Sequence, residues 1–476
     1  MADQSFSPDA VCDFATWKPV LRLLWEGRAD EQGAVPVRVA GRIARQSWSL
    51  PLRRRQPRVE REGAESEAVE RVRRALVDAG VDGVSFNVKI EPDGQCTLRL
   101  LGPTPAVHSG IGSSEPGTLL LVEGAVPEPW RRLPDAVPGA AAAAAPSADP
   151  ALLERTLRER LPDAVGATEA EIAAAEARLG VSLPEELKVL YRVTGARWDG
   201  PDEDSGEGSG EGWGEGHEAA ERAAAAVGCE LFALDEVYVA DAASRPCPWE
   251  FAAQEAVVTP PDSAVQGLVG SPGWIAFGDN GGGDRLAVDL TPGPCGNAGQ
   301  IIILGHEENA GAGLVADSLT ALVTNRLGER RDSSGRDRTQ AVAHVNIRSL
   351  PSVEAAAHPE LEVLSIGVWE AEPLSLAPVL GLPRLRTLAA YPGTLADPLE
   401  IAGLTTLEYL ELGPEDWRVL LDAGAVPRSL LAAAVKVHGD QDPGPTVAIA
   451  NELLALWNRP QIIRTALEGD LGPVPR

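Results

Sequence analysis

The stretch FGDNGGGDRLAVDL, from Phe277 to Leu290, holds three consecutive glycines between aspartates. A phosphate-binding loop of the Walker type places a lysine after its glycines, because the lysine neutralises the phosphates. Here Asp284 and Arg285 follow instead, and a carboxylate repels an anion. A dinucleotide-binding loop opens a helix, whereas RLAVDL alternates like a strand. The stretch is therefore not predicted to bind nucleotide phosphates.

A β-hairpin explains this stretch better. Ile275 and Phe277 alternate with small residues before the glycines, and Leu286 and Val288 alternate after them. Asn280 and Gly281 form the pair favoured where both residues of a tight turn need positive φ. The aspartates can accept hydrogen bonds from turn amides. We therefore predict two antiparallel strands joined by a glycine-rich turn.

The oxygen-bearing side chains of the turn leave an alternative open. An EF-hand loop needs oxygen ligands at its third and fifth positions. Counted from Asp279, those positions hold Gly281 and Gly283, so this pattern fails. An irregular calcium site built from Asp279, Asn280 and Asp284 remains the alternative. The hairpin is the favoured interpretation, with no metal and no cofactor expected.

Charge and cysteine content restrict the class of protein. The chain has 476 residues and a net charge of −28, from 42 basic and 70 acidic side chains. Such a surface repels nucleic acid and anionic membranes and attracts basic proteins. The five cysteines are far apart and never form a CxxC pair. With no signal-peptide pattern and no apolar run of about 20 residues, we expect a cytoplasmic protein. Scarce lysine and abundant arginine and alanine are typical of a high-GC bacterial genome.

Two segments of low complexity divide the chain. Residues 135–150 are rich in alanine and proline, and residues 328–340 are charged and lack large apolar side chains. Both compositions are typical of linkers. They separate a first block at 1–134, a central block at 151–327 and a third block at 341–476.

The first block has an α+β pattern. Residues 66–80 have the apolar spacing of a helix, whereas 84–90 and 96–101 alternate like strands around an EPDG turn. The run WSLPLRRRQPR, at 48–58, is locally basic. A solvated edge is the favoured interpretation of this run, and a binding role is the alternative. No function is predicted for this block.

The central block begins with two helical patterns. Thr168 and Glu171 form a capping box before the first helix, and the second follows at 183–195. An acidic, glycine-rich insert at 199–221 comes next. Strand-like segments then surround the glycine hairpin, and GLVADSLTALVTNRL at the end of the block is predicted as an amphipathic helix.

The third block contains a repeat. HPELEVLSI, LPRLRTLAA and LTTLEYLEL align with spacings of 24 and 22 residues, which is typical of leucine-rich repeats. The middle copy departs from the pattern at Ala390. Trp369 and Glu415 stand where an asparagine or cysteine is usual. We expect a short leucine-rich-repeat-like region, with capping helices from Val426 onward.

Short motifs in the central block carry a family resemblance. They are Leu183-Pro184-Glu185-Glu186-Leu187, Leu190-Tyr191 with Gly195, Trp274 to Gly278, Asn280 to Asp284, Asp289, and Val315-Ala316-Asp317-Ser318-Leu319. In this order they resemble the Smi1/Knr4 family, also called the SUKH superfamily. Two departures are Thr194, where the family usually has asparagine, and the long insert after Trp198. The resemblance implies an α+β fold in which a mixed sheet carries helices on one side.

The resemblance also implies a function. Bacterial members of that family are immunity proteins that bind and neutralise toxins, and fungal members are regulatory hub proteins. We therefore expect no enzyme, but a protein-binding module that sequesters a basic toxin domain. A multidomain scaffold or regulator without a toxin is the alternative. An enzyme in the first block is a third possibility, although neither HExxH nor GxSxG occurs in the chain.

Candidate contacts with the partner lie in the acidic insert and at the hairpin tip. Carboxylates there would pair with basic groups of the partner, and aromatic side chains would fill its cleft. The candidates are Trp198, Asp202, Asp204, Trp213, Asp279, Asn280 and Asp284. No catalytic, cofactor-binding or metal-binding residue is predicted.

Overall fold

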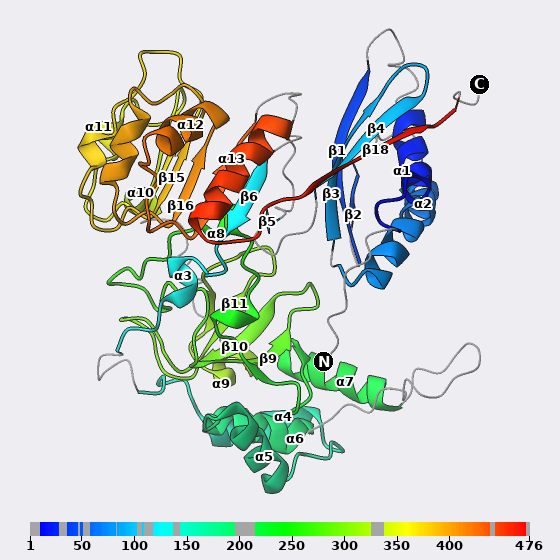
Figure 1. Ribbon diagram of the computed structural model, residues 1–476. Helices are drawn as coiled ribbons and strands as arrows, with labels where there is room; N and C mark the ends of the chain where they lie inside the picture. Colours follow the sequence, from blue (N-terminus) through cyan, green and yellow to red (C-terminus); the bar gives the residue numbers. More distant parts are fainter. Residues whose placement is uncertain are drawn as a thin grey trace.

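The computed structural model contains three β-sheets, each with its own hydrophobic core (Figure 1). It describes residues 10–27, 36–45, 48–50, 58–81, 83–101, 107–108, 118–136, 143–195, 215–324, 338–437 and 443–472. We refer to the three parts as the N-terminal unit, the central unit and the repeat unit. The fold is α+β, as the sequence predicts.

The N-terminal unit is a five-stranded antiparallel sheet in the order β18-β4-β3-β1-β2, covered on one face by two helices. Trp17 from the first helix meets Phe86 of the sheet edge-on at 5.2 Å between ring centroids. The elements are α1 (Phe14–Glu26), β1 (Val37–Ala44), β2 (Trp48–Ser49), α2 (Arg58–Asp78), β3 (Gly83–Ile90), β4 (Gln95–Leu101) and β18 (Arg464–Asp470). The predicted helix and both predicted strands are confirmed as α2, β3 and β4.

The central unit has a six-stranded sheet with helices packed on one face. Every pairing in it is antiparallel, whereas the resemblance implied a mixed sheet. The elements are α4 (Pro150–Arg160), α5 (Glu169–Leu179), α6 (Glu185–Thr194), α7 (Glu215–Val227), β7 (Glu230–Leu231), β8 (Tyr238–Val239), η2 (Ala242–Ser244), α8 (Trp249–Ala252), β9 (Trp274–Asp279), β10 (Arg285–Asp289), β11 (Gln300–Leu304), β12 (Gly313–Ala316) and α9 (Leu319–Val323). The predicted capping box at α5 is present, with Thr168 and Glu171 bonding each other's backbone amides.

The end of the central unit differs from the prediction. Instead of one helix, Gly313–Ala316 forms β12 and pairs with β11, and only Leu319–Val323 is helical. The Ser318 hydroxyl starts this helix by accepting a hydrogen bond from the Ala321 amide. The helical spacing therefore holds only after Ser318, because the preceding residues complete a sheet edge.

The repeat unit is a seven-stranded sheet in the order β13-β14-β15-β16-β17-β6-β5. Its first five strands are parallel, and Leu364, Leu388 and Leu410 lie side by side in register. The elements are β5 (Val107–His108), β6 (Leu119–Val122), α10 (Arg338–Ala341), β13 (Val342–Val345), α11 (Val353–Ala356), β14 (Val363–Ile366), η3 (Ala377–Val379), β15 (Thr387–Ala390), η4 (Pro398–Gly403), β16 (Tyr409–Leu412), α12 (Pro414–Asp422), β17 (Ala432–Val435) and α13 (Pro443–Leu456). The short helix α3 (Glu128–Arg131), which follows β6, packs through Trp130 against the central unit.

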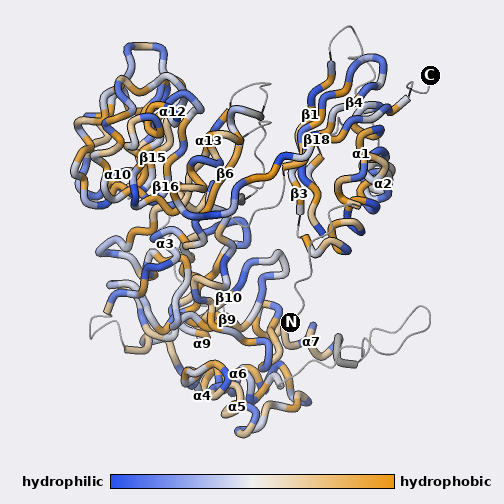
Figure 2. The backbone as a smooth tube through the Cα atoms, viewed as in Figure 1, coloured by the Kyte–Doolittle hydropathy of each residue, from blue (hydrophilic) through white to orange (hydrophobic). Residues whose placement is uncertain are grey.

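The alignment of the three repeats thus predicts which strands are neighbours. Membership of a leucine-rich-repeat family stays a prediction. The expected helical cap is α13, but β17 and β18 were not foreseen in this part of the chain. Figure 2 shows hydrophobic residues gathered along the strands and hydrophilic residues in most connecting loops.

The three structural units do not coincide with the three blocks of sequence that composition suggests. β6 lies in the first block of the sequence but pairs with β17 of the repeat unit. β18 lies near the C-terminal end but pairs with β4 of the N-terminal unit, and Figure 1 shows the chain crossing between the two units to reach it. Within the predicted linker at 135–150, Ala144 forms a β-bridge with Ala298 of the central unit. Of the helices described, none is long and apolar enough to cross a membrane.

Candidate protein-binding site

The glycine hairpin connects β9 to β10, as predicted, and Asp279 holds its loop from inside. One carboxylate oxygen of Asp279 accepts hydrogen bonds from the amides of Gly281 at 2.7 Å and Gly283 at 3.3 Å. The other oxygen pairs with the Arg285 guanidinium. Asp279 is only 7% exposed. Its carboxylate therefore stabilises the loop and is not presented to a partner.

Asn280 holds the other side of the same loop. Its side-chain oxygen accepts hydrogen bonds from the amides of Gly282 at 2.8 Å and Asp284 at 3.1 Å. Its side-chain amide donates to the Asp284 carboxylate at 2.8 Å. Positive φ falls on Gly281 and Gly283 and not on Asn280. The loop is therefore longer than the two-residue Asn-Gly turn that the sequence predicts, and its glycines serve backbone geometry.

Asp284 joins the hairpin to the residues after β11. One of its carboxylate oxygens accepts from the His306 amide at 2.9 Å and lies 2.8 Å from His306 Nδ1. These two contacts lower the pKa of the Asp284 carboxyl. The Asp284 hydrogen bond raises the pKa of the His306 imidazole. Asp284 thus links two loops, a role that its distance in sequence from His306 does not reveal.

The hairpin tip presents mainly backbone to solvent. Asn280, Gly281 and Gly282 are exposed, whereas the carboxylate of Asp279 bonds loop amides and that of Asp284 bonds Asn280 and His306. Within the described ranges, no group of three or more histidine, cysteine, aspartate or glutamate side chains is arranged to hold a metal ion. The predicted contacts in the insert, Trp198, Asp202, Asp204 and Trp213, lie outside the described residues.

Glu186 connects the motifs at the two ends of the central unit. Its carboxylate accepts hydrogen bonds from the amides of Leu319 and Thr320, each at 3.1 Å, and contacts the Thr320 hydroxyl. Glu186 is 8% exposed and stands in the first turn of α6. It therefore satisfies amides that begin α9, which would otherwise lack partners. The sequence gives no local signal for this contact, because 133 residues separate Glu186 from Leu319.

Trp249 of the central unit packs against the repeat unit. Its ring stacks on Tyr409 of β16 with 6.5 Å between centroids, and its indole nitrogen donates to the Ala125 carbonyl at 3.2 Å. Both rings are almost fully buried. Ala432 and Leu120, from neighbouring strands, complete this cluster. The face of the repeat sheet opposite the leucines is thus partly covered by helix α8.

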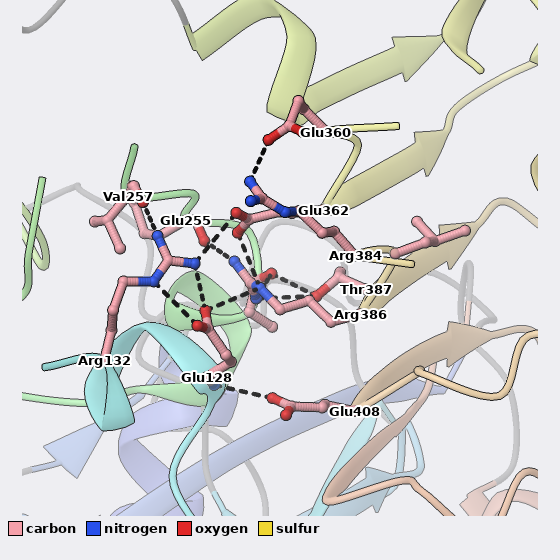
Figure 3. Close-up of polar contacts among 12 residues, drawn as sticks. Glu128, Arg132, Glu255, Val257, Glu360, Glu362, Arg384, Arg386, Thr387 and Glu408 are labelled. Carbon is pink, nitrogen blue, oxygen red and sulfur yellow. Dashed lines mark hydrogen bonds and ion pairs between the residues drawn. The ribbon is translucent and has the colours of Figure 1, made fainter. Parts of the chain in front are cut away.

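A buried network of charges borders this contact (Figure 3). Arg386 and Glu362, from equivalent positions of two repeats, lie 3.3 Å apart and are 4% and 2% exposed. Arg132, which follows α3, bonds Glu128 at 2.8 Å and Glu362 at 3.2 Å. Arg386 also donates to the carbonyls of Ala253, at 3.3 Å, and Glu255.

Because Arg386 and Glu362 are buried, each charge needs a partner of opposite sign. Removing one partner of a buried ion pair leaves an uncompensated charge, so such pairs persist only when their hydrogen bonds are satisfied. Burial lowers the pKa of Arg386, against the opposing effect of Glu362. The guanidinium meets both carboxylates and main-chain carbonyls of the central unit. The network therefore fixes the repeat unit in one orientation against the central unit.

The comparisons with known proteins identify the central unit. Residues 166–325 match the model of the SMI1 / KNR4 family (SUKH-1). A Schizosaccharomyces pombe protein named cell wall biosynthesis/cell cycle regulator smi1 is 41% identical over 49 residues, 10% of this chain and 10% of that protein. A Neurospora crassa glucan synthesis regulatory protein is 47% identical over 47 residues, which are 10% of this chain and 9% of that protein.

A Yarrowia lipolytica KNR4/SMI1 homolog is 45% identical over 47 residues, which are 10% of this chain and 7% of that protein. This chain therefore matches no more than about a tenth of the length of these relatives. Helices α5 to α9 and the glycine hairpin lie within the residues that match the family, whereas α4 precedes them. The central part of this chain, residues 166–325, is thus similar to the SMI1/KNR4 family (SUKH-1), whose model it matches.

Proposed function

We propose that this chain is a multidomain scaffold or regulator whose SMI1/KNR4-family domain binds a protein partner and catalyses no reaction. Two relatives are named as regulators, one of cell wall biosynthesis and the cell cycle and one of glucan synthesis. Those names favour the regulatory alternative over toxin neutralisation. All five cysteines are unpaired, which supports a cytoplasmic, reducing location.

This proposal rests mainly on the hydrogen bonds that the carboxylates of the glycine hairpin accept. The carboxylates of Asp279 and Asp284 are engaged by amides and by neighbouring side chains. A general acid or base needs a proton-transfer site that can reach a substrate. The exposed part of the loop is instead Asn280 to Gly282, a backbone surface held in shape by hydrogen bonds to the side chains of Asp279 and Asn280. Such a surface suits protein recognition.

Toxin neutralisation remains a second candidate because of the charge of the chain. A net charge of −28 attracts a basic protein and accelerates their encounter. The partner would then be a basic toxin domain whose cleft is covered by the acidic surface. Such binding would weaken as salt rises, because exposed charges are screened.

Affinity purification of the tagged full chain from its native lysate, at low and moderate salt, separates these candidates. The regulator proposal predicts a stoichiometric partner that persists at moderate salt. A single basic partner released by moderate salt would favour toxin neutralisation. No stoichiometric partner at either salt would contradict both.

A further inference from the structure

The outer strand of the N-terminal sheet is supplied by the far end of the chain. β18 pairs antiparallel with β4 and reaches it after the chain crosses from the repeat unit (Figure 1). The other four strands and both helices of this unit come from residues 14–101. Among the described side chains that are buried in the N-terminal core, only Leu471 comes from the C-terminal segment. The sheet formed by β2, β1, β3 and β4 therefore has nearly all of its core without β18.

Helix α1 holds the C-terminal segment by its main chain. The Lys18 ammonium donates to the Asp470 carbonyl at 3.0 Å, and the Arg22 guanidinium donates to the Leu471 carbonyl at 2.8 and 3.1 Å. The Leu471 amide donates to the Gly94 carbonyl at 3.0 Å. Together with strand pairing, main-chain contacts of this kind are how a sheet edge binds an extended peptide, because they do not depend on the side chains of that peptide.

Three alternate positions of the segment determine which sequence fits beside β4. Leu467 and Leu471 both pack on the N-terminal core, and Leu471 is fully buried. Between them, Gly469 lies against the Phe14 ring, so a Cβ atom at this position would collide with the ring. The side chains at the two intervening positions are exposed. These contacts therefore select the pattern Leu-x-Gly-x-Leu, which occurs in this chain only at 467–471.

Few side chains anchor β18 to the sheet. Within the strand, exposed residues alternate with half-buried ones, and none is fully buried. The residue that precedes the strand, Ile463, is 72% exposed. An edge strand with so little buried surface opens at a lower free energy than the interior strands of its sheet. When β18 opens, the edge of β4 and the contacts on α1 become available to another strand.

We propose that the edge of β4, together with Phe14, Lys18 and Arg22 of α1, is a binding site for an extended Leu-x-Gly-x-Leu segment of a partner protein. In this chain β18 occupies the site as an intramolecular ligand, so a partner segment must displace it. The contacts described above use two leucines, a glycine and main-chain groups, all of which a partner segment can supply. The site belongs to the N-terminal unit and is independent of the hairpin in the central unit.

Fluorescence anisotropy of a labelled peptide with the sequence of residues 464–472 tests the proposal. In the wild-type full chain, β18 competes with the peptide at the high effective concentration of a tethered strand. Leu471→Ala in the full chain weakens β18 and should therefore tighten peptide binding by about tenfold or more. Leu467→Ala, which removes a half-buried contact, should produce a smaller shift in the same direction. Circular dichroism confirms that each variant is folded.

Two matched controls separate binding at this site from nonspecific binding. Glu468→Ala in the full chain changes an exposed side chain of β18 and should leave peptide binding as in the wild type. A peptide carrying Gly469→Val keeps both leucines but does not fit against Phe14, so it should not bind the Leu471→Ala chain.

The proposal is overturned if none of these chains binds the wild-type peptide, or if the Gly469→Val peptide binds as tightly as the wild-type peptide. Light scattering of the wild-type chain checks the choice of occupant. A dimer that dissociates when the peptide is added would overturn the partner assignment in favour of a second copy of the chain.

Discussion

Glu186 shows how one side chain can unite distant motifs. It lies in the Leu183–Leu187 motif, yet its carboxylate binds the amides that begin α9. The neighbouring Glu185 is exposed and pairs with Arg192, at 2.6 Å. Two adjacent glutamates of the same motif therefore have different roles, which follow from burial.

Replacing Glu186 with alanine should destabilise the central unit. The amides of Leu319 and Thr320 would lose their buried acceptor, and each unsatisfied group costs about 1–3 kcal/mol. Glu185→Ala removes only an exposed ion pair, which contributes less than about 1 kcal/mol. Urea unfolding monitored by tryptophan fluorescence measures both. Equal losses in the two variants would contradict this role of Glu186.

Asp289 makes the stability of the central unit dependent on pH. Burial raises the pKa of its carboxyl to about 6, and hydrogen bonds from Gln300 and Thr291 oppose this effect only in part. A raised folded-state pKa means that the protonated form is favoured in the folded protein. The protonated Asp289 carboxyl therefore contributes to the free energy of unfolding. Its contribution is fully present below about pH 4, the pKa of an unfolded aspartate, and is lost as pH rises through about 6.

Comparison of the wild type with Asp289→Asn tests this pH dependence. The wild type should lose up to about 3 kcal/mol relative to the variant between pH 4 and 7. The amide cannot ionise, so its altered contact with Gln300 adds a cost that does not vary with pH. Denaturant unfolding at several pH values gives the difference. Parallel pH profiles for the two proteins would show that Asp289 does not titrate in this range.

Local contacts were predictable from sequence and distant ones were not. The capping box of Thr168 and Glu171 spans three residues, and the Asp279 and Asn280 loop contacts span two to four. Such spacings are visible in a sequence because chain geometry brings the groups together. The contact between Asp284 and His306 crosses from one hairpin to the next. It depends on the pairing of β10 with β11, which no local pattern encodes.

Among the larger elements, β18 departs furthest from the sequence-based division. It pairs with β4 along all seven of its residues, from Arg464 opposite Leu101 to Asp470 opposite Gln95. Leu471 is then fully buried in the N-terminal core. A short alternating segment near the end of a chain resembles many exposed tails. Its partner strand lies more than 360 residues earlier, so its place in the sheet could not be predicted.

Deleting residues 464–476 should open the N-terminal sheet. Amides of Gln95–Leu101 that bond β18 would lose their partners, and the core would lose Leu471. Hydrogen exchange in β4 should therefore accelerate by about tenfold or more, because protection follows the free energy of local opening. Deleting only residues 473–476 is the control. Unchanged exchange in β4 after the longer deletion would contradict the pairing.

The repeats were the most predictable elements. Leu361, Leu385 and Leu407 align in the sequence and are all fully buried in one core. The Ala390 departure does not interrupt the sheet, because Ala390 still pairs with Ile366 in register. A periodic apolar pattern reports burial directly. The outward side of the strands carries no such pattern, which is why its contact with the central unit was missed.

The whole molecule is organised around the junction of the central and repeat units. Trp249 and Tyr409 form its apolar part, and Arg386 with Glu362 its charged part. Solenoid repeats generally present an extended surface for binding. In the structure, part of the sheet face is already occupied by α8 of the same chain. The two units are therefore packed against each other through this junction.

Trp249→Ala should uncouple the two units. Removing a fully packed tryptophan costs about 3–5 kcal/mol, and here the loss falls on the junction. Calorimetry should then show a separate, lower transition. Phe251→Ala on the same helix is the control, because Phe251 is 44% exposed and its removal should cost less than about 1 kcal/mol. A single unshifted transition for Trp249→Ala would argue against coupling of the two units.

The most direct test of the proposed function is quantitative affinity purification of the full chain carrying Gly282→Gln. This change adds a side chain at the exposed hairpin tip, and the nearest atom to the new Cβ is Asn280 Oδ1 at 3.2 Å. Gly63→Gln on α2 is the control, since open space surrounds that position. The proposal predicts that Gly282→Gln loses the stoichiometric partner that the wild type and Gly63→Gln retain. Retention of the same partner by all three proteins would contradict binding through the hairpin.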